Sequence, residues 1–234
     1  MKKSQIVMFV MLLVVIPATL LLGMKLPGRS YYLLSAIVAI EILIPFFMAF
    51  EGRKPQPREL VTVAVMAALV TIARVAVPLP SFKPTYAVIM LTGIAFGPET
   101  GFIVGALGAL GSDFFYGQGP FTPWQMMAYG MAGLLSGFAY QRNWLPRKNW
   151  VMGVFCFVCV VTLIGPLLDT STVVIIVTTF TWENMLPIYA SGLPVNLTQG
   201  ACSFLTMLFF GNAILEKLDR VRTQYGMMES EDGI

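Results

Sequence analysis

The sequence predicts an all-α integral membrane protein. Of its 234 residues, 57% are hydrophobic and only 12% are charged, which is about half the charged share of a typical soluble domain. Several runs of about 18 or more apolar residues are separated by short polar segments, and this is the length that a helix needs to cross a bilayer. Because lipid offers backbone N–H and C=O groups no partner, the spans are expected to be helices.

Eight spans are predicted, two at the N-terminus and six after a charged, proline-bearing linker at 53–58. In chain order they cover roughly 5–23, 31–50, 59–78, 85–97, 100–114, 123–140, 150–168 and 194–215. The first span follows Met1-Lys2-Lys3, and we expect it to be retained because no small-residue cleavage site follows it. The fourth span is only about 20 Å long as a helix. The proline-rich segment before it is therefore expected to enter the membrane region, where protein or a cavity must surround it.

The seventh span leaves two interpretations open. Gly165-Pro166 should kink or end the helix, yet 172–180 is apolar and β-branched. Either the helix continues past the kink or a short segment folds back. Both place Asp169 near the membrane boundary.

The distribution of basic residues predicts the orientation. Eleven lysines and arginines fall on the side of the two termini and three on the other side, so both termini are expected to be cytoplasmic. The segments 78–84, 111–125 and 169–196 then lie on the outer side. Polar and aromatic residues concentrate there, which suggests capture of a solute from outside.

The outer segment 111–125 is predicted to form part of a ligand site. It combines one carboxylate, two amides and five aromatic side chains with helix-breaking glycine and proline. Aromatic rings offer apolar area and stacking, while a few polar groups fix a ligand's orientation. The predicted binding residues are Phe82, Lys83, Tyr86, Asp113, Tyr116, Gln118, Trp124, Trp182, Asn184, Asn196 and Gln199.

Charged residues within or beside the spans are functional candidates, because a charge in lipid is costly. They are Glu41, Arg74, Asp113 and Asp169. Arg74 either snorkels outward or faces a cavity. For Glu41, the alternative to a functional role is that it only pairs with a nearby residue.

The residue types present argue against enzymatic chemistry. The chain has no histidine, the commonest general base and metal ligand, so no metal and no cofactor are expected. Cys156 and Cys159 form a C-x-x-C inside an apolar run, where packing is favoured over redox or metal chemistry. The patterns of intramembrane aspartyl and serine proteases are missing, and so is a G-x-x-x-x-G-K-[ST] phosphate loop for ATP.

Small residues recur at helical spacing and predict close helix packing. The row from Gly101 to Gly111 and the pair Gly133 and Gly137 are interpreted as contacts inside the bundle. Ala64 and Ala68 follow directly after the linker and are open to a partner helix.

Taken together, these motifs resemble the S component of energy-coupling factor (ECF) transporters. The resemblance is carried by Gly97-Pro98-Glu99-Thr100-Gly101-Phe102, Ser112-Asp113-Phe114-Phe115, Gly117-Gln118-Gly119-Pro120, Thr122-Pro123-Trp124-Gln125-Met126 and Leu193-Pro194-Val195-Asn196. It covers about 58–222. It implies a six-helix core (53–222) preceded by two extra transmembrane helices (1–52) and followed by a disordered cytoplasmic tail (223–234). Asn196 and Gln199 depart from the acidic residue and histidine that many relatives carry there.

The resemblance implies a high-affinity substrate-capture subunit of an ECF-type ABC importer in the bacterial plasma membrane. The substrate would be a vitamin or related micronutrient, with cobalamin as the leading expectation. The implied partners are a transmembrane coupling subunit and two cytoplasmic ATPases, and Ala64 and Ala68 match the small-residue motif that meets the coupling subunit. The alternative is a stand-alone secondary transporter, which would need a coupling charge near the membrane midplane.

Overall fold

The computed structural model confirms the predicted fold class. It describes residues 57–177 and 181–224 continuously and, before them, residues 6–7, 10–23, 37, 40–41 and 44. Within these residues the chain forms helices and loops and no strand. The N-terminal spans predicted at 5–23 and 31–50 are therefore only partly described, and the tail predicted at 223–234 lies almost wholly outside.

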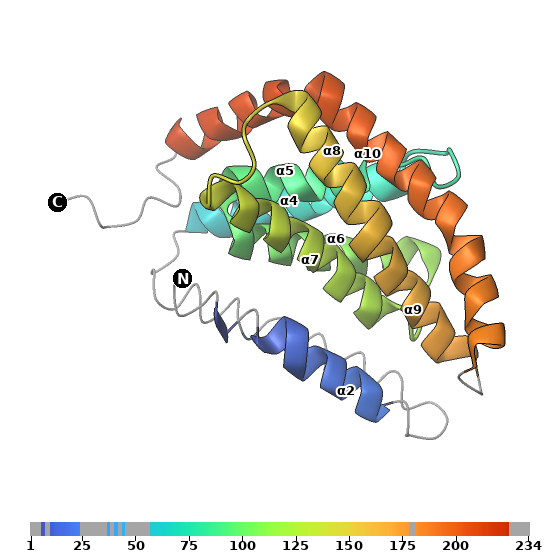
Figure 1. Cartoon of the computed structure of the whole chain (residues 1–234). Helices are drawn as coiled ribbons and strands as arrows, with labels where there is room; N and C mark the ends of the chain where they lie inside the picture. Colours follow the sequence, from blue (N-terminus) through green and yellow to red (C-terminus); the bar gives the residue numbers. More distant parts are fainter. Residues whose placement is uncertain are drawn as a thin grey trace.

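The helices follow the predicted order, with differences at their ends (Figure 1). They are η1 (Met11–Val15), α2 (Ile16–Gly23), α4 (Pro57–Val75), α5 (Thr85–Phe96), α6 (Pro98–Tyr116), α7 (Thr122–Gln141), α8 (Asn149–Cys159), η3 (Val160–Ile164), α9 (Gly165–Ile176) and α10 (Trp182–Gln224). The spans predicted at 85–97, 100–114 and 123–140 match α5, α6 and α7 to within two residues. Two helical runs in the described part are long and apolar enough on their own to cross a membrane, 149–176 and 182–224.

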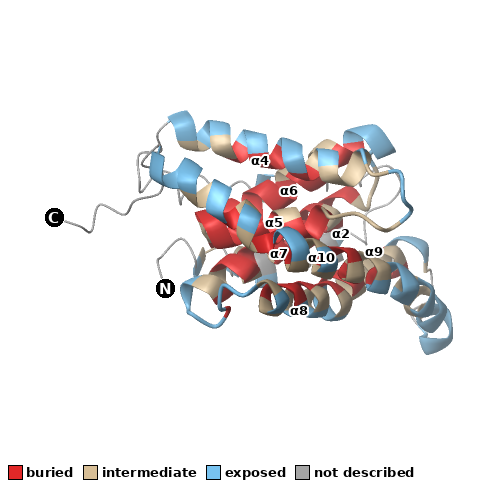
Figure 2. Cartoon of the chain, turned by 90° about the horizontal axis from the view of Figure 1, so that it is seen from above, coloured by how far each residue is buried: buried red, intermediate tan, exposed pale blue. Residues whose placement is uncertain are grey.

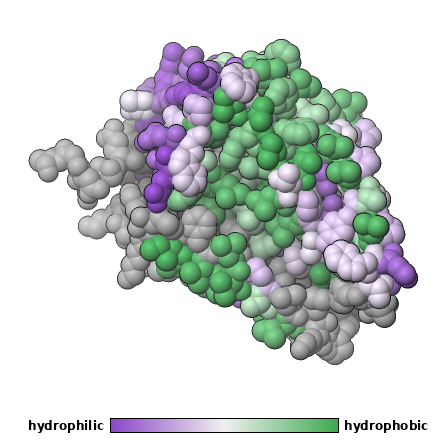
Figure 3. All heavy atoms as spheres, viewed as in Figure 1, coloured by the Kyte–Doolittle hydropathy of each residue, from purple (hydrophilic) through white to green (hydrophobic). Residues whose placement is uncertain are grey.

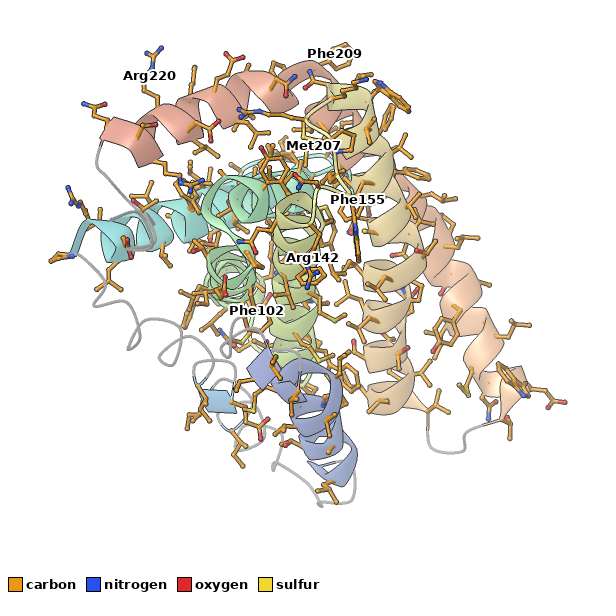
Figure 4. The ribbon with its side chains drawn as sticks, turned by 60° about the vertical axis from the view of Figure 1, so that its left-hand side comes forward. Phe102, Arg142, Phe155, Met207, Phe209 and Arg220 are labelled. Atoms are coloured by element: carbon orange, nitrogen blue, oxygen red, sulfur yellow. The ribbon has the colours of Figure 1, made fainter. Side chains whose placement is uncertain are left out.

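Helices α5, α6 and α7 form the buried centre of the molecule (Figure 2). A Cβ added to Gly133 would lie 2.1 Å from the carbonyl oxygen of Gly101, and one added to Gly105 would lie 2.3 Å from that of Tyr129. The backbones therefore touch directly, which confirms that these glycine rows serve packing within the bundle. Phe102, only 1% exposed, fills the space beside them (Figure 4).

A single glycine connects α5 to α6. Gly97 has a φ of 98°, a left-handed conformation that residues with a Cβ rarely adopt. The chain therefore reverses direction in one residue, and Pro98 starts the next helix at a position where its missing N–H costs nothing.

The seventh predicted span continues through Pro166 as one helical run, α8–η3–α9. The five residues before Gly165 are π-helical. Proline has no N–H for an ordinary helical bond, and a π-helical stretch is one way in which a helix accommodates such a break. The run ends at Ile176, and α10 already begins at Trp182. The segment 169–196, expected to be an outer connection, therefore lies mostly on two helices, and the last span starts 12 residues before the predicted residue 194.

Helix α10 bends partway along its length (Figure 1), and the side chain of Asn149 bonds to its backbone at Leu208 and Asn212. Asn149 Nδ2 donates to the Leu208 carbonyl at 2.9 Å, and Asn149 Oδ1 accepts from the Asn212 N–H at 2.9 Å. Leu208 and Asn212 are four residues apart and would bond to each other in an uninterrupted helix. An inserted side chain is a recognised cause of helix bending.

Beyond the bend, α10 lies across one end of the bundle. Arg147 forms an ion pair with Asp219 at 2.5 Å, and Arg222 donates to the Ala95 carbonyl at 3.2 Å. Phe209 and Arg220 point away from the bundle (Figure 4). Hydrophilic residues gather at this end, while hydrophobic residues cover much of the visible flank (Figure 3).

Among the described N-terminal residues, the Thr19 hydroxyl donates to Glu41 at 2.7 Å. Glu41 thus has the local pairing that the sequence left open. Ile16 is 1% exposed and belongs to the hydrophobic core.

Candidate ligand-binding site

A cavity of about 270 Å³ lies at one end of the bundle. The C-terminal ends of α4 and α6 and the N-terminal ends of α5 and α7 surround it, and α9 and α10 contribute one residue each. Its wall is formed by Arg74, Ser81, Lys83, Thr85, Tyr86, Tyr116, Gln125, Tyr129, Leu168 and Gln199. The loop at 142–148 lies at the other end of α7.

A buried ion pair fixes one side of the cavity. Arg74 Nη1 lies 2.8 Å from Asp113 Oδ1 and also donates to the Ser112 hydroxyl. The guanidinium carbon lies 5.3 Å from the ring centroids of both Tyr116 and Tyr129, within the range of cation–π contacts. Of the two interpretations of Arg74, the structure therefore supports the one in which it faces a cavity.

Lys83 is held at the wall by Tyr116. Its Nζ donates to the Tyr116 hydroxyl at 2.6 Å and lies 4.7 Å from the centroid of the same ring. The Tyr116 hydroxyl in turn donates to the Arg74 carbonyl at 2.9 Å. Tyr116 thus ties the loop before α5 to the end of α4.

Three polar atoms of the wall are buried without a hydrogen-bond partner of normal geometry among the described residues. They are Thr85 Oγ1, Tyr86 Oη and Gln125 Oε1. A buried polar group left unpaired costs about 1–3 kcal/mol and calls for an explanation. The Tyr86 ring packs edge-on against Tyr129, with 5.0 Å between centroids. All three atoms belong to side chains of the cavity wall.

Of the predicted binding residues, Lys83, Tyr86, Tyr116 and Gln199 lie in the wall of the cavity. Asp113 is fully buried behind it as the counter-ion of Arg74. Phe82, Gln118, Trp124, Trp182, Asn184 and Asn196 do not line it. Trp182 is 80% exposed and Asn184 is also exposed, because α10 begins at this point. Trp124 is 7% exposed and packs in the core beside Gln125.

Asn196 joins α10 to α9. Its Nδ2 donates to Asp169 Oδ2 at 2.8 Å. A Cβ on Gly192 would lie 2.2 Å from Asp169 Oδ1, and one on Gly165 would lie 2.3 Å from Asn196 Cγ. Gly192 of α10 therefore leaves room for the Asp169 side chain of α9, and Gly165 of α9 leaves room for the Asn196 side chain of α10. The hydrogen bond between Asp169 and Asn196 links the two helices.

Sequence reasoning missed Ser81, Thr85, Gln125, Tyr129 and Leu168 as wall residues. Thr85 and Tyr129 lie on apolar helices and resemble ordinary core residues. The one available signal was the spacing of Gln125 and Tyr129, which places both on the same face of α7.

The described residues contain no group of three or more His, Cys, Asp or Glu side chains able to hold a metal ion. Cys156 and Cys202 are buried, and all three cysteines are free thiols.

Within the described residues, a helical bundle with two membrane-length helical runs and a polar, aromatic cavity at one end is the architecture of a membrane protein with room for a small molecule. The chain belongs to the family described as the ECF-type riboflavin transporter, S component, whose model matches residues 54–216. The family is a transporter component of bacterial membranes and not an enzyme, so the predicted ECF relationship is confirmed.

Individual relatives agree with the family. The chain is 30% identical over 133 residues to the folate transporter FolT of Streptococcus mutans, covering 53% of this chain and 71% of that protein. It is 27% identical over 165 residues to a UPF0397 protein of Lactococcus lactis, covering 66% and 83% of the two chains. No solved structure matches. These relatives do not support the expected cobalamin subgroup.

Proposed function

We propose that this chain captures a vitamin with one flat ring system for an ECF-type importer. The observation that carries the proposal is the cavity itself, where Thr85, Tyr86 and Gln125 keep buried polar atoms unpaired. Family membership supports the capture role.

The size of the cavity restricts the substrate. Its volume of about 270 Å³ lies just below the ~300–1,000 Å³ of typical small-molecule sites. One fused ring system fits, with the remainder of the ligand at the mouth. A corrinoid macrocycle is far larger. Folate and riboflavin, the vitamins named by the relative and the family, each carry a single flat fused ring.

Ligand titration of the purified protein tests this proposal. Isothermal calorimetry should detect saturable binding of folic acid or riboflavin and none of cobalamin. Gln125→Leu removes the unpaired amide at nearly constant volume and should weaken binding by about tenfold, because one hydrogen bond is worth about 1 kcal/mol. The matched control Gln118→Leu alters an exposed amide and should change nothing. Absence of binding by both vitamins, or unchanged affinity in Gln125→Leu, would overturn the assignment.

We propose further that α4 docks onto the coupling subunit. Ala64 and Ala68 are exposed, and the large apolar side chains of Val61, Val65 and Ile72 beside them are 62%, 53% and 56% exposed. Small residues allow a second helix backbone to approach closely in a membrane. This face of α4 thus has the composition of a helix–helix contact.

Co-purification with the coupling subunit and its two ATPases tests the docking face. Ala64→Trp should abolish co-purification and leave vitamin binding intact. Val158→Trp changes a 47% exposed residue of α8 and serves as the control. Normal assembly of Ala64→Trp would refute the docking face, and uptake without any ATPase would refute the importer mechanism.

A further inference from the structure

We infer that Lys83 recognises an acidic group, so that the captured ligand is a flat ring carrying a carboxylate or phosphate arm. This inference rests on the proposed capture function and specifies its substrate class. It is derived from the charges in the wall of the cavity.

Two cations line the cavity, and only one is neutralised. Arg74 is paired with the fully buried Asp113. Lys83 bonds to the Tyr116 hydroxyl and pairs with no described carboxylate. The cavity wall therefore carries one net positive charge, which an acidic ligand would balance.

The ammonium of Lys83 is already in place before a ligand arrives. The Tyr116 hydroxyl accepts from it at 2.6 Å, and the same hydroxyl is anchored on the Arg74 carbonyl at 2.9 Å. A lysine side chain otherwise loses much rotational freedom on binding, and prior placement reduces that cost. A charge-assisted bond from this position is stronger than a neutral one.

The burial of the wall residues indicates where each of the two parts of the ligand would lie. Thr85 and Tyr86 are 3% and 2% exposed, whereas Lys83 is half-buried in the loop before them. The ring would lie deep, with an amide-like edge toward the carboxamide of Gln125, whose Oε1 has no partner among the described residues. The acidic arm would lie at the mouth against Lys83. Folate carries such an arm, whereas the ribityl chain of riboflavin is neutral.

Two pairs of probes with constant rings test this inference. Folic acid is compared with its dimethyl ester, and riboflavin 5′-phosphate with riboflavin. For each pair that the native protein binds, the acidic member should bind about tenfold more tightly than the neutral member, a difference of about 1.4 kcal/mol. Lys83→Met should remove this preference and Lys83→Arg should retain it. Lys217→Met, on the far end of α10, should leave it unchanged.

The salt dependence of binding to the native protein gives a measurement that needs no variant. Affinity for the acidic probe should fall as KCl rises, whereas affinity for its neutral partner should not. Equal affinity for both members of a pair, or a preference that survives in Lys83→Met, would overturn the role of Lys83 while vitamin capture stands. Failure of all four probes to bind would overturn both proposals.

Discussion

At the scale of single residues, the Arg74–Asp113 pair connects stability to the site. Asp113 has a fully buried side chain, and its second oxygen, Oδ2, has no hydrogen-bond partner of normal geometry among the described residues. Arg74 also contacts the rings of Tyr116 and Tyr129, which line the cavity. The carboxylate therefore positions the guanidinium and, through it, two aromatic walls.

Asp113→Asn should destabilise the protein by about 3–5 kcal/mol, because it leaves the Arg74 charge without its buried counter-ion. Asp219→Asn breaks the Arg147 pair, whose side chains are 34% and 39% exposed, and should cost under about 1 kcal/mol. Thermal unfolding of the two purified variants in one detergent gives the comparison. Similar small losses in both would show that the Asp113 pair contributes no more than a surface ion pair.

The residues of the site that the sequence could predict are polar or aromatic groups next to helix ends. Lys83, Tyr86 and Tyr116 stand out in this way. The exposed positions of Trp182 and Asn184, away from the cavity wall, could not be predicted, because they depend on where α10 begins. Asp113 was recognised as important, but its partner Arg74 lies 39 residues earlier, and sequence alone does not show that the two meet.

At the scale of helices, a proline or glycine in the sequence is a reliable sign that a helix is disturbed. It is a less reliable sign that the helix ends there. Gly97 does end α5, as the span ending at 97 required. Gly165-Pro166 does not end its helix, because π-helical turns before it absorb the irregularity. The bend in α10 coincides with two hydrogen bonds from Asn149, some 60 residues away along the chain. Within α10 only Gly211, which lies beside the Asn149 side chain, is a local sign of it.

Asn149→Ala should release the end of α10 from the bundle. The substitution removes both hydrogen bonds that Asn149 makes to the α10 backbone at Leu208 and Asn212, a loss of about 1–2 kcal/mol. The population in which the terminal segment is detached should rise by about 5- to 30-fold. Limited trypsin digestion should therefore cleave faster after Lys217 and Arg220.

The neighbouring substitution Lys148→Ala serves as the control for this experiment, since it leaves both Asn149 bonds in place. Digestion of Asn149→Ala at the native rate would contradict the role of Asn149 in holding the bend.

At the scale of the whole molecule, the centre and the two ends of the bundle have different characters. Backbone contacts at Gly101, Gly105 and Gly133 hold α5, α6 and α7 rigidly together. The cavity lies at one end of this centre, lined by side chains from six helices or their adjoining loops. Basic residues gather at the opposite end, in the loop at 142–148 and the terminal part of α10. From the positive-inside rule we expect this basic end to be cytoplasmic and the cavity to open outward.

Cysteine labelling in cells tests this orientation. In a variant whose three native cysteines are replaced by alanine, Gln118→Cys lies in an exposed loop at the cavity end and Arg220→Cys at the basic end. A membrane-impermeant maleimide should modify the first in intact cells and the second only after the membrane is opened. The distinction matters because a capture subunit must meet its ligand from outside. Modification of Arg220→Cys alone in intact cells would place the cavity in the cytosol and would be incompatible with uptake by this route.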